Sequence, residues 1–178
     1  LFFTNNFMKL YNKEFVEAMY GQETINGLYV SGKVGYENRS PLFNNTDHKF
    51  MKTDDLYSSN DPLQPTNFTS TPFVEHHLYK ASVGARIRFG QKYITRPDRK
   101  ITVSDDNYPV LYLGYQKAFA GSDNNYNYDL LNATLDFDKK LGNKGDFSLR
   151  LKAGKFFNAE NISFVDYKYF NGNQTHVV

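Results

Sequence analysis

Charged side chains at alternating positions are the residues of this sequence best suited to chemistry. They fall opposite apolar residues along extended stretches, and there are eight: Lys33, Glu37, Arg86, Arg88, Asp136, Asp138, Arg150 and Lys152. Since successive side chains of a β-strand point to opposite faces, we predict that these residues form a band on one face of a sheet. Such a band can line a passage and select which ions or solutes cross it. Its charges can instead pair across strands and make the sheet rigid, and the opposite signs of facing residues favour this second interpretation.

Histidines and nearby acidic residues give only weak signals for a metal site. His76 and His77 are adjacent at the start of an expected strand, so they point to opposite faces and cannot bind one ion together. A loop site made by these histidines with Glu75, Asp47 and His48 is a less favoured alternative. We therefore predict no metal ion.

The acidic segment Asp123–Asp129 resembles a calcium-binding loop in its spacing alone. It lacks the glycine that such loops carry at position six, and position twelve is Thr134 where glutamate is needed. The sequence also contains no Gly-x-Ser-x-Gly, Walker A or dinucleotide-binding pattern. We therefore interpret the segment as a polar surface turn, and we expect no cofactor and no enzymatic activity.

The composition of the chain favours β-structure and excludes several classes of function. The 178 residues carry a net charge of +2 with scattered basic residues, which gives no electrostatic basis for binding nucleic acid. Cysteine is absent, so disulfides and thiolate metal sites are excluded. Aromatic residues make up 17% of the chain and favour strands. The mean hydropathy is −0.62, and no stretch approaches the roughly 18 apolar residues of a membrane helix.

The stretch 127–157 predicts a long hairpin with one apolar and one polar face. Residues that pair directly in a sheet point to the same side. Since the apolar residues of both strands have odd numbers, the residue numbers of each pair must add up to an even number. This excludes a two-residue turn and leaves a loop of three or five residues near Gly142 and Gly145. Asp136 faces Arg150 in the first case and Lys152 in the second. The apolar residues that set this rule all have odd numbers: Leu131, Ala133, Leu135, Phe137, Leu141, Phe147, Leu149, Leu151, Ala153 and Phe157.

Three further stretches alternate in the same way and predict strands, at 25–40, 78–89 and 110–119. Residues 1–24 form an uncertain lead-in that fits either a helical stripe or a strand. The segment 42–72 is rich in Pro, Asn and Asp and predicts a long loop with a functional or covering role. The segments 90–109 and 158–173 are interpreted as a connection and a loop, and residues 1–178 as one domain.

The alternating pattern suits a soluble sheet and a membrane barrel equally well, but three features favour the membrane. Several strands reach eleven residues or more, as transmembrane strands do. If Gly142 lies at the periplasmic end, the 42–72 loop and the turn near Ala120 lie outside the cell, with 90–109 as an exception. Aromatic residues gather at strand ends as in an interfacial girdle: Tyr36, Phe89, Tyr108, Phe119, Tyr128, Phe156 and Phe157.

Closure of the sheet is a separate requirement for a membrane barrel. We expect five strands and one or two more, whereas membrane barrels contain at least about eight, because an open edge in lipid leaves backbone groups unpaired. The sequence starts without methionine or a recognisable export signal and ends as if it were entering another strand. We therefore expect a fragment of a longer, exported protein whose other strands close the barrel.

Several stretches of the chain resemble an uncharacterised outer-membrane family of the Bacteroidetes group. Members of that family carry an N-terminal carboxypeptidase-regulatory-like β-domain, followed by a domain of unknown function that ends in a barrel. The resemblance implies that this chain is a partial barrel segment, and it implies no catalytic set because the family's activity is unassigned. The residues that carry it are Phe7–Tyr11, Tyr36–Leu42, Gly90–Ile94 with Pro97–Arg99, Gly121–Asp123 with Tyr126–Leu130, and most specifically Gly154–Phe157 with Phe164–Thr175.

From these observations we predict an all-β fold, an antiparallel up-and-down sheet that is part of a transmembrane β-barrel which this chain alone does not close. The predicted role is that of an integral protein of the bacterial outer membrane, as a passive channel or transporter or as an envelope scaffold. Its predicted partners are outer-membrane lipid and other envelope proteins that contact loop 42–72, and not nucleic acid. The alternatives are a subunit of an outer-membrane assembly or secretion complex, and a soluble β-sandwich or small-barrel binding module.

Overall fold

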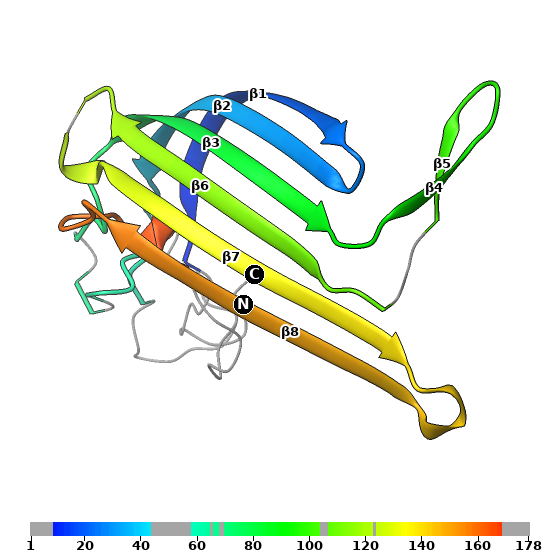
Figure 1. The fold of residues 1–178 in the computed structure, drawn as a ribbon. Helices are drawn as coiled ribbons and strands as arrows, with labels where there is room; N and C mark the ends of the chain where they lie inside the picture. Colours follow the sequence, from blue (N-terminus) through cyan, green and yellow to red (C-terminus); the bar gives the residue numbers. More distant parts are fainter. Residues whose placement is uncertain are drawn as a thin grey trace, which may run out of the picture.

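Six long antiparallel strands form one sheet in the computed structural model (Figure 1). The structure describes residues 9–43, 58–64, 66–67, 70–103, 107–122 and 124–168. A separate hairpin follows the third strand of the sheet along the chain and precedes the fourth. It consists of β4 (Lys92–Thr95) and β5 (Lys100–Val103). The predicted all-β fold with an up-and-down antiparallel sheet is therefore confirmed. In spatial order the strands of the sheet are β1 (Tyr11–Ile25), β2 (Leu28–Pro41), β3 (His76–Arg88), β6 (Val110–Ala120), β7 (Tyr128–Lys140) and β8 (Asp146–Phe157).

Helical structure is limited to short 3-10 turns in the described part of the chain. They are η1 (Asn124–Tyr126), between β6 and β7, η2 (Gly142–Lys144), between β7 and β8, and η3 (Phe164–Asp166), which follows β8. Within these described ranges, no helix has the length and apolar character needed to cross a membrane.

The N-terminal segment forms a strand, β1. For the described residues, from 9 onwards, the strand interpretation of residues 1–24 is therefore the right one. β1 pairs with β2 along its whole length, with one irregularity close to the turn. Tyr11, Phe15 and Met19 are four residues apart, and this spacing places residues on one face of a strand as well as of a helix. The helical interpretation of this stripe is therefore wrong, while residues 1–8 lie outside the described residues.

The β7–β8 hairpin has the shorter of the two predicted turns. The N–H of Leu141 donates a hydrogen bond of 2.8 Å to the carbonyl of Gly145, which leaves three residues in the loop. The numbers of paired residues have an even sum throughout the hairpin. Asp136 consequently pairs with Arg150, and the five-residue alternative, in which Asp136 pairs with Lys152, is wrong.

The register of the strands divides the whole sheet into two faces. Between β1 and β2, up to Glu23, the residue numbers of each directly paired couple add up to an even number. The same holds for the pairings of β3 with β6, β6 with β7 and β7 with β8. Between β2 and β3 the sum is odd. Directly paired residues point to the same side. One face, called the polar face below, therefore carries the odd-numbered residues of β1 and β2 and the even-numbered residues of the other four strands. All eight residues of the predicted charge band lie on the polar face, and the opposite side is called the apolar face.

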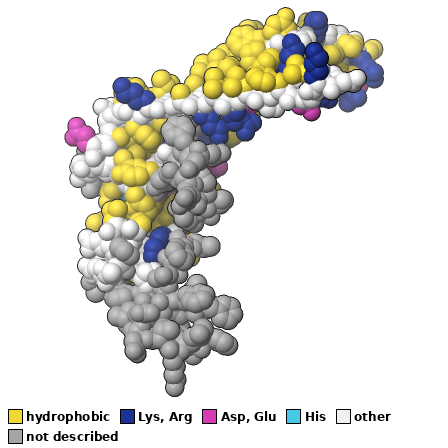
Figure 2. Space-filling view, turned by 90° about the horizontal axis from the view of Figure 1, so that it is seen from below, with side chains coloured by type: hydrophobic (Ala, Val, Ile, Leu, Met, Phe, Trp, Pro, Cys, Tyr) yellow, Lys and Arg dark blue, Asp and Glu magenta, His cyan; other side chains and the backbone are white. Residues whose placement is uncertain are grey.

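The apolar face is exposed along its length. In Figure 2, hydrophobic side chains cover most of the upper side of the right-hand arm, whereas charged side chains show along its lower side and at its tip. The molecule is bent in this view, and the polar face lies on the inside of the bend. Central side chains of the apolar face are between 41% and 59% exposed, namely Val34, Val83, Leu113, Leu131 and Leu151.

The buried core lies on the polar face, near the end of the sheet where β3 begins. The ring of Phe73, just before β3, lies 6.0 Å from that of Tyr11 and 6.3 Å from that of Phe164 between centroids. Residues after β8 cover a second group, in which Ala159 and Ile162 pack against Ala118, Tyr128, Leu130 and Phe156. Segments outside the sheet therefore create the core by packing onto its polar face.

The predicted grouping of aromatic residues at the strand ends is only partly right. Tyr128 and Phe156 lie on the polar face, where Tyr128 is almost fully buried, so their assignment to an exposed girdle is wrong. Phe89 and Tyr108 lie outside the strands, in the segment between β3 and β6. Three of the predicted residues do lie on the apolar face near one end of the sheet: Tyr36, Phe119 and Phe157.

Short and long connections between the strands lie at opposite ends of the sheet, with one exception. The short turns after β1 and β7 lie at one end, and the strand ends that the segments 42–75 and 121–127 connect lie at the other. The exception is the segment 89–109, which was predicted as a plain connection. It contains the β4–β5 hairpin, which projects away from the sheet in Figure 1.

The two-residue turn between β1 and β2 is fixed by contacts with the segment after β3. The Arg88 N–H donates to the Gly27 carbonyl over 2.8 Å, and the Gly27 N–H donates to Glu23 Oε1 over 2.9 Å. The Gln91 side-chain amide donates to the same oxygen over 2.7 Å. Gly27 has a φ of +82°, and a Cβ added there would lie 2.5 Å from the Arg88 carbonyl oxygen.

We expect Gly27→Ala to destabilise the sheet more than Gly142→Ala. Both glycines have positive φ, which costs alanine about 1–2 kcal/mol, but a Cβ at Gly142 meets nothing within 4 Å. At Gly27 the collision with a backbone carbonyl adds about 1–3 kcal/mol. Equilibrium unfolding in urea measures both changes, and equal losses of unfolding free energy would contradict the contact between Gly27 and Arg88.

Candidate functional site

Asp166 connects the segment after β8 to three strands of the sheet through its carboxylate. Arg39 donates from Nη1 to Oδ2 over 2.6 Å and from Nη2 to Oδ1 over 2.9 Å. The ammonium of Lys80 and the hydroxyl of Tyr128 also donate to Oδ1, over 2.9 Å and 3.0 Å. One carboxylate thus accepts four hydrogen bonds from donors on β2, β3 and β7.

Glu37 is the second acid of this site and its only member that belongs to the predicted charge band. Its Oε1 pairs with Arg39 and, over 2.6 Å, with Lys80, while its Oε2 lies 2.7 Å from the ammonium of Lys13. Glu37 and Arg39 are two residues apart in β2 and therefore point to the same face. We call this group the charge cluster; it consists of Lys13, Glu37, Arg39, Lys80, Tyr128 and Asp166.

The charge cluster has a buried centre, two partly exposed lysines, and more basic than acidic groups. Arg39 is 2% exposed and Asp166 is 7% exposed, and three basic side chains face two carboxylates. Burial by itself would raise the pKa of Asp166, but the hydrogen bond from Arg39 and the charges of Lys80 and Arg39 outweigh it and lower the pKa to about 2. The Asp166 carboxylate is therefore ionised at neutral pH, and its charge is balanced by donors that the sheet holds in place.

His76 lies beside the charge cluster on the polar face, as the strand neighbour of Arg39. Its ring stacks on Tyr126 with 3.9 Å between centroids, and its Nδ1 lies 2.7 Å from the Val74 carbonyl oxygen. Three buried polar atoms have no hydrogen-bond partner within the described ranges: Nε2 of His76, Nε of Arg39 and Oγ of Ser163. Buried polar groups are normally paired, so this site has unused hydrogen-bonding capacity.

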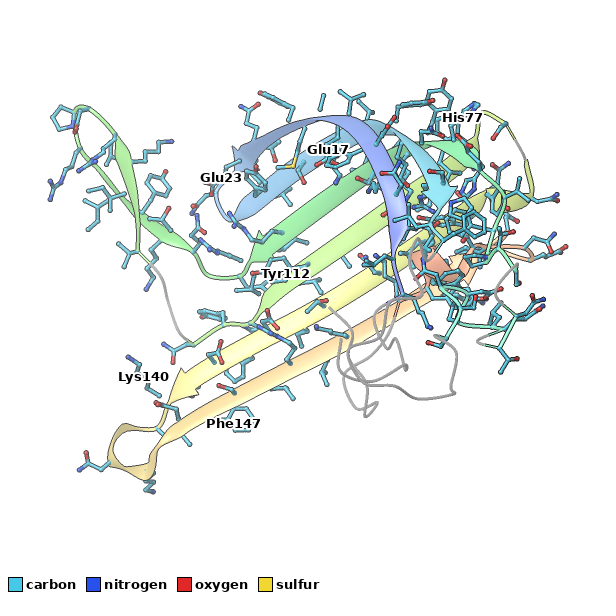
Figure 3. The ribbon with its side chains drawn as sticks, turned by 180° about the vertical axis from the view of Figure 1, so that it is seen from behind. Glu17, Glu23, His77, Tyr112, Lys140 and Phe147 are labelled. Atoms are coloured by element: carbon cyan, nitrogen blue, oxygen red, sulfur yellow. The ribbon has the colours of Figure 1, made fainter. Side chains whose placement is uncertain are left out.

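A pocket of about 150 Å³ lies beside the charge cluster on the polar face. Its lining includes Lys80, Tyr128 and Asp166 of the charge cluster, together with Phe15 and Lys33. Figure 3 looks onto this face of the sheet, with Glu17 on β1 and Tyr112 on β6 labelled. The arrangement can hold an anionic group against the cluster and leaves space next to it.

Other members of the predicted charge band form pairs of their own. Arg150 donates to both carboxylate oxygens of Asp136, over 2.6 Å and 3.2 Å. The ammonium of Lys33 lies 3.0 Å from Oε2 of Glu17. Both pairs are largely exposed to solvent, so each contributes little to stability, but they balance charge along the polar face.

The last four members of the band are not brought together with these pairs. The guanidinium of Arg86 lies 5.0 Å from the centre of the Tyr29 ring. Arg88 and Asp138 line a pocket of about 280 Å³ near the base of the β4–β5 hairpin. Lys152 faces Thr134 across the strands, and neither it nor Asp138 has a side-chain ion pair with any described residue.

No group of three or more His, Asp or Glu side chains in the described part of the chain could hold a metal ion. His76 and His77 lie on opposite faces, as predicted, with His76 buried beside Arg39 and His77 on the apolar face. Asp47 and His48, which were the weaker candidates, lie outside the described residues.

Sequence reasoning missed most of the charge cluster. Arg39 would have been found by extending the alternation of β2 one step beyond Glu37. Lys80 has the same parity as Arg86 and could have been included on that ground. No local pattern identifies Asp166, because it lies 127 residues from Arg39 in a segment predicted only as a loop.

The fold and the site together define an all-β antiparallel meander with an exposed apolar face and a buried charge cluster on the other face. Residues 1–178 match the family model described as the C-terminal domain of a family of unknown function, DUF5686, so the chain belongs to this family. No curated protein and no solved structure matches the chain.

We expect Asp166→Asn to release residues 158–168 from the polar face. Removing one partner of a buried ion pair costs on the order of 3–5 kcal/mol, and Arg39 and Lys80 lose the negative charge of their shared partner, while one carboxylate oxygen becomes an amide donor. Hydrogen–deuterium exchange should become faster in 158–168 while β7 and β8 stay protected. The control is Asp98→Asn, because Asp98 lies 3.8 Å from Arg99 with both side chains exposed. Equal protection of 158–168 in the two variants would contradict the anchoring role of Asp166.

The anchoring of residues 158–168 should survive mild acid and fail only at low pH. The pKa of Asp166 is about 2 in the folded chain and about 3.9 in an unfolded one. Its contribution to stability is therefore complete above about pH 5 and is lost as the pH falls through about 4 towards 2. Pepsin, which is active in this range, should cut 158–168 increasingly over it. Asp166→Asn should lack this step, and a step near neutral pH would implicate a histidine instead.

Proposed function

We propose that the chain forms part of the wall of a β-barrel in a bacterial outer membrane, with its apolar face against lipid and its polar face towards the interior. The observation that carries this proposal is the position of the core. A soluble sheet normally covers its apolar face, whereas here Val34, Val83, Leu113, Leu131 and Leu151 on that face are at least 41% exposed, and the buried strand residues other than Asp129 lie on the polar face. A continuous exposed apolar face needs lipid or a partner to cover it.

The lengths of the strands support contact with lipid on this scale. The six strands contain between 11 and 15 residues. Since a strand rises about 3.3 Å per residue, eleven residues tilted by about 40° span roughly 28 Å. This distance is close to the roughly 25 Å height of the apolar band of outer-membrane barrels.

The free edges of β1 and β8 require further strands under this proposal. No described strand pairs with either edge, and unpaired backbone groups cost several kcal/mol each in lipid. Membrane barrels contain at least about eight strands. We therefore propose that strands beyond the six described here close the barrel.

Within such a barrel, the polar face favours the role of an envelope scaffold over that of an open passage. Arg150 pairs with Asp136 and Lys33 with Glu17, so charges along this face balance one another instead of presenting one sign to a solute. Asp166 in addition ties a segment of the chain onto the same face. In this proposal loop 42–72 is the surface that contacts other envelope proteins, and the chain has no catalytic role.

We expect Leu151→Arg to reduce membrane insertion far more than Thr134→Arg. Leu151 pairs with Leu135 on the apolar face, and Thr134 precedes Leu135 on the polar face, so the two sites lie at the same depth. An arginine that faces lipid at mid-depth costs about 2–4 kcal/mol, whereas one that faces a polar interior costs little. Flotation of the full-length protein with phospholipid vesicles measures the inserted fraction.

Equal insertion of the two variants would contradict lipid contact at the apolar face. Recovery of the unmodified full-length protein in the aqueous phase after detergent extraction would instead favour the soluble alternative. In that case a second sheet or a partner protein would have to cover the apolar face.

A further inference from the structure

We propose that the charge cluster is a binding site for the carboxylate of a small organic acid, and that Asp166 is the built-in occupant of this site. The inference goes beyond the proposed location in a membrane and does not depend on it. Every contact involved lies between the polar face of the sheet and the segment that follows β8.

The sheet fixes the donors of this site, whereas a segment outside the sheet supplies the carboxylate. Arg39, Lys80 and Tyr128 converge on one carboxylate group over 2.6–3.0 Å. The Tyr128 oxygen itself accepts a hydrogen bond of 2.7 Å from Gln116, which leaves its hydroxyl proton for Asp166. A planar guanidinium with two parallel donors binds carboxylate and phosphate groups in a bidentate way, and its occupant here is the carboxylate of Asp166.

The site has donor capacity that Asp166 does not use. Nε of Arg39 has no partner among the described residues, although Arg39 is only 2% exposed. If Asp166 left, the Arg39 guanidinium would also lose the acceptor of two hydrogen bonds, and Lys80 would keep Glu37 as its only acidic partner among the described residues. Removing one partner of a buried charge pair is costly, so the empty site would favour a replacement carboxylate.

Space for the rest of a ligand lies next to the carboxylate. The pocket of about 150 Å³ borders on Lys80 and Asp166, and a water molecule accounts for about 30 Å³ of liquid. The pocket therefore matches the volume of about five waters, which suits an acid of a few carbon atoms. Phe15 also lines it and provides an apolar contact, while the charge of Lys33 is balanced by Glu17, which lines the same pocket.

Removal of the built-in occupant tests the site directly. In Asp166→Ala the carboxylate is absent and its space is open, so sodium acetate should raise the thermal unfolding temperature of the full-length protein. We expect a saturable shift that recovers at least half of the loss caused by the substitution, because a ligand that binds only the folded state stabilises it. Sodium chloride at the same ionic strength should give no such recovery, and phosphate should give a smaller one.

The matched control is Asp98→Ala, which removes an exposed carboxylate far from the charge cluster, so acetate should have no effect on it. A missing acetate response of Asp166→Ala, or equal responses of the two variants, would overturn the proposal. If Asp166→Ala does not fold, the unmodified protein decides: acetate should speed hydrogen exchange in 158–168 several-fold relative to chloride, and unchanged exchange would overturn the proposal. Flotation with vesicles reports on the membrane proposal alone, so the two proposals fail separately.

Discussion

One register, kept across six strands, is the constraint on which both faces of this sheet depend. Because side chains alternate with a period of two, a slip by one residue in any pairing would carry the charged residues of that strand to the apolar face. At one end, the contact between Gly27 and Arg88 fixes β1 and β2 against β3. At the other end, the charge cluster joins β1, β2, β3 and β7 through ion pairs and hydrogen bonds. The contacts that form the candidate site are thus also contacts that oppose a slip of register.

The charge cluster lies where a soluble domain would place apolar side chains, and this determines how the segment after β8 is held. A buried ion pair adds little net stability, because the loss of hydration opposes the attraction. Its geometry is nevertheless specific, because the guanidinium of Arg39 donates two parallel hydrogen bonds to the two carboxylate oxygens of Asp166. The neighbouring hydrophobic group of Ala118, Tyr128 and Leu130 supplies apolar burial with Ile162. Position and stability of the segment therefore come from two adjacent groups that share only Tyr128.

Local alternation was enough to predict five of the six strands of the sheet, the even sum in the β7–β8 hairpin and the common face of the charge band, because each depends only on a period of two. It left β1 open between a helix and a strand and missed β4 and β5. It could not choose between a three- and a five-residue turn, since both keep that parity. The contact of Asp166 with Arg39 is long-range and has no local pattern. The aromatic girdle failed for another reason, because the even numbers of Tyr128 and Phe156 already place them on the polar face.

The free edge of β8 limits which strand can pair with it. Such a strand must continue both faces, with apolar side chains beside Leu149 and Leu151 and polar ones beside Arg150 and Lys152. Arg150 is already paired with Asp136, whereas Lys152 has no ion pair with any described residue. An acidic side chain opposite Lys152 would extend the balance of charge that the polar face shows elsewhere. The charge cluster departs from this balance, because it has three bases for two acids and Nε of Arg39 is a buried donor without a partner among the described residues. We therefore expect an anion to bind there and not along the rest of the band.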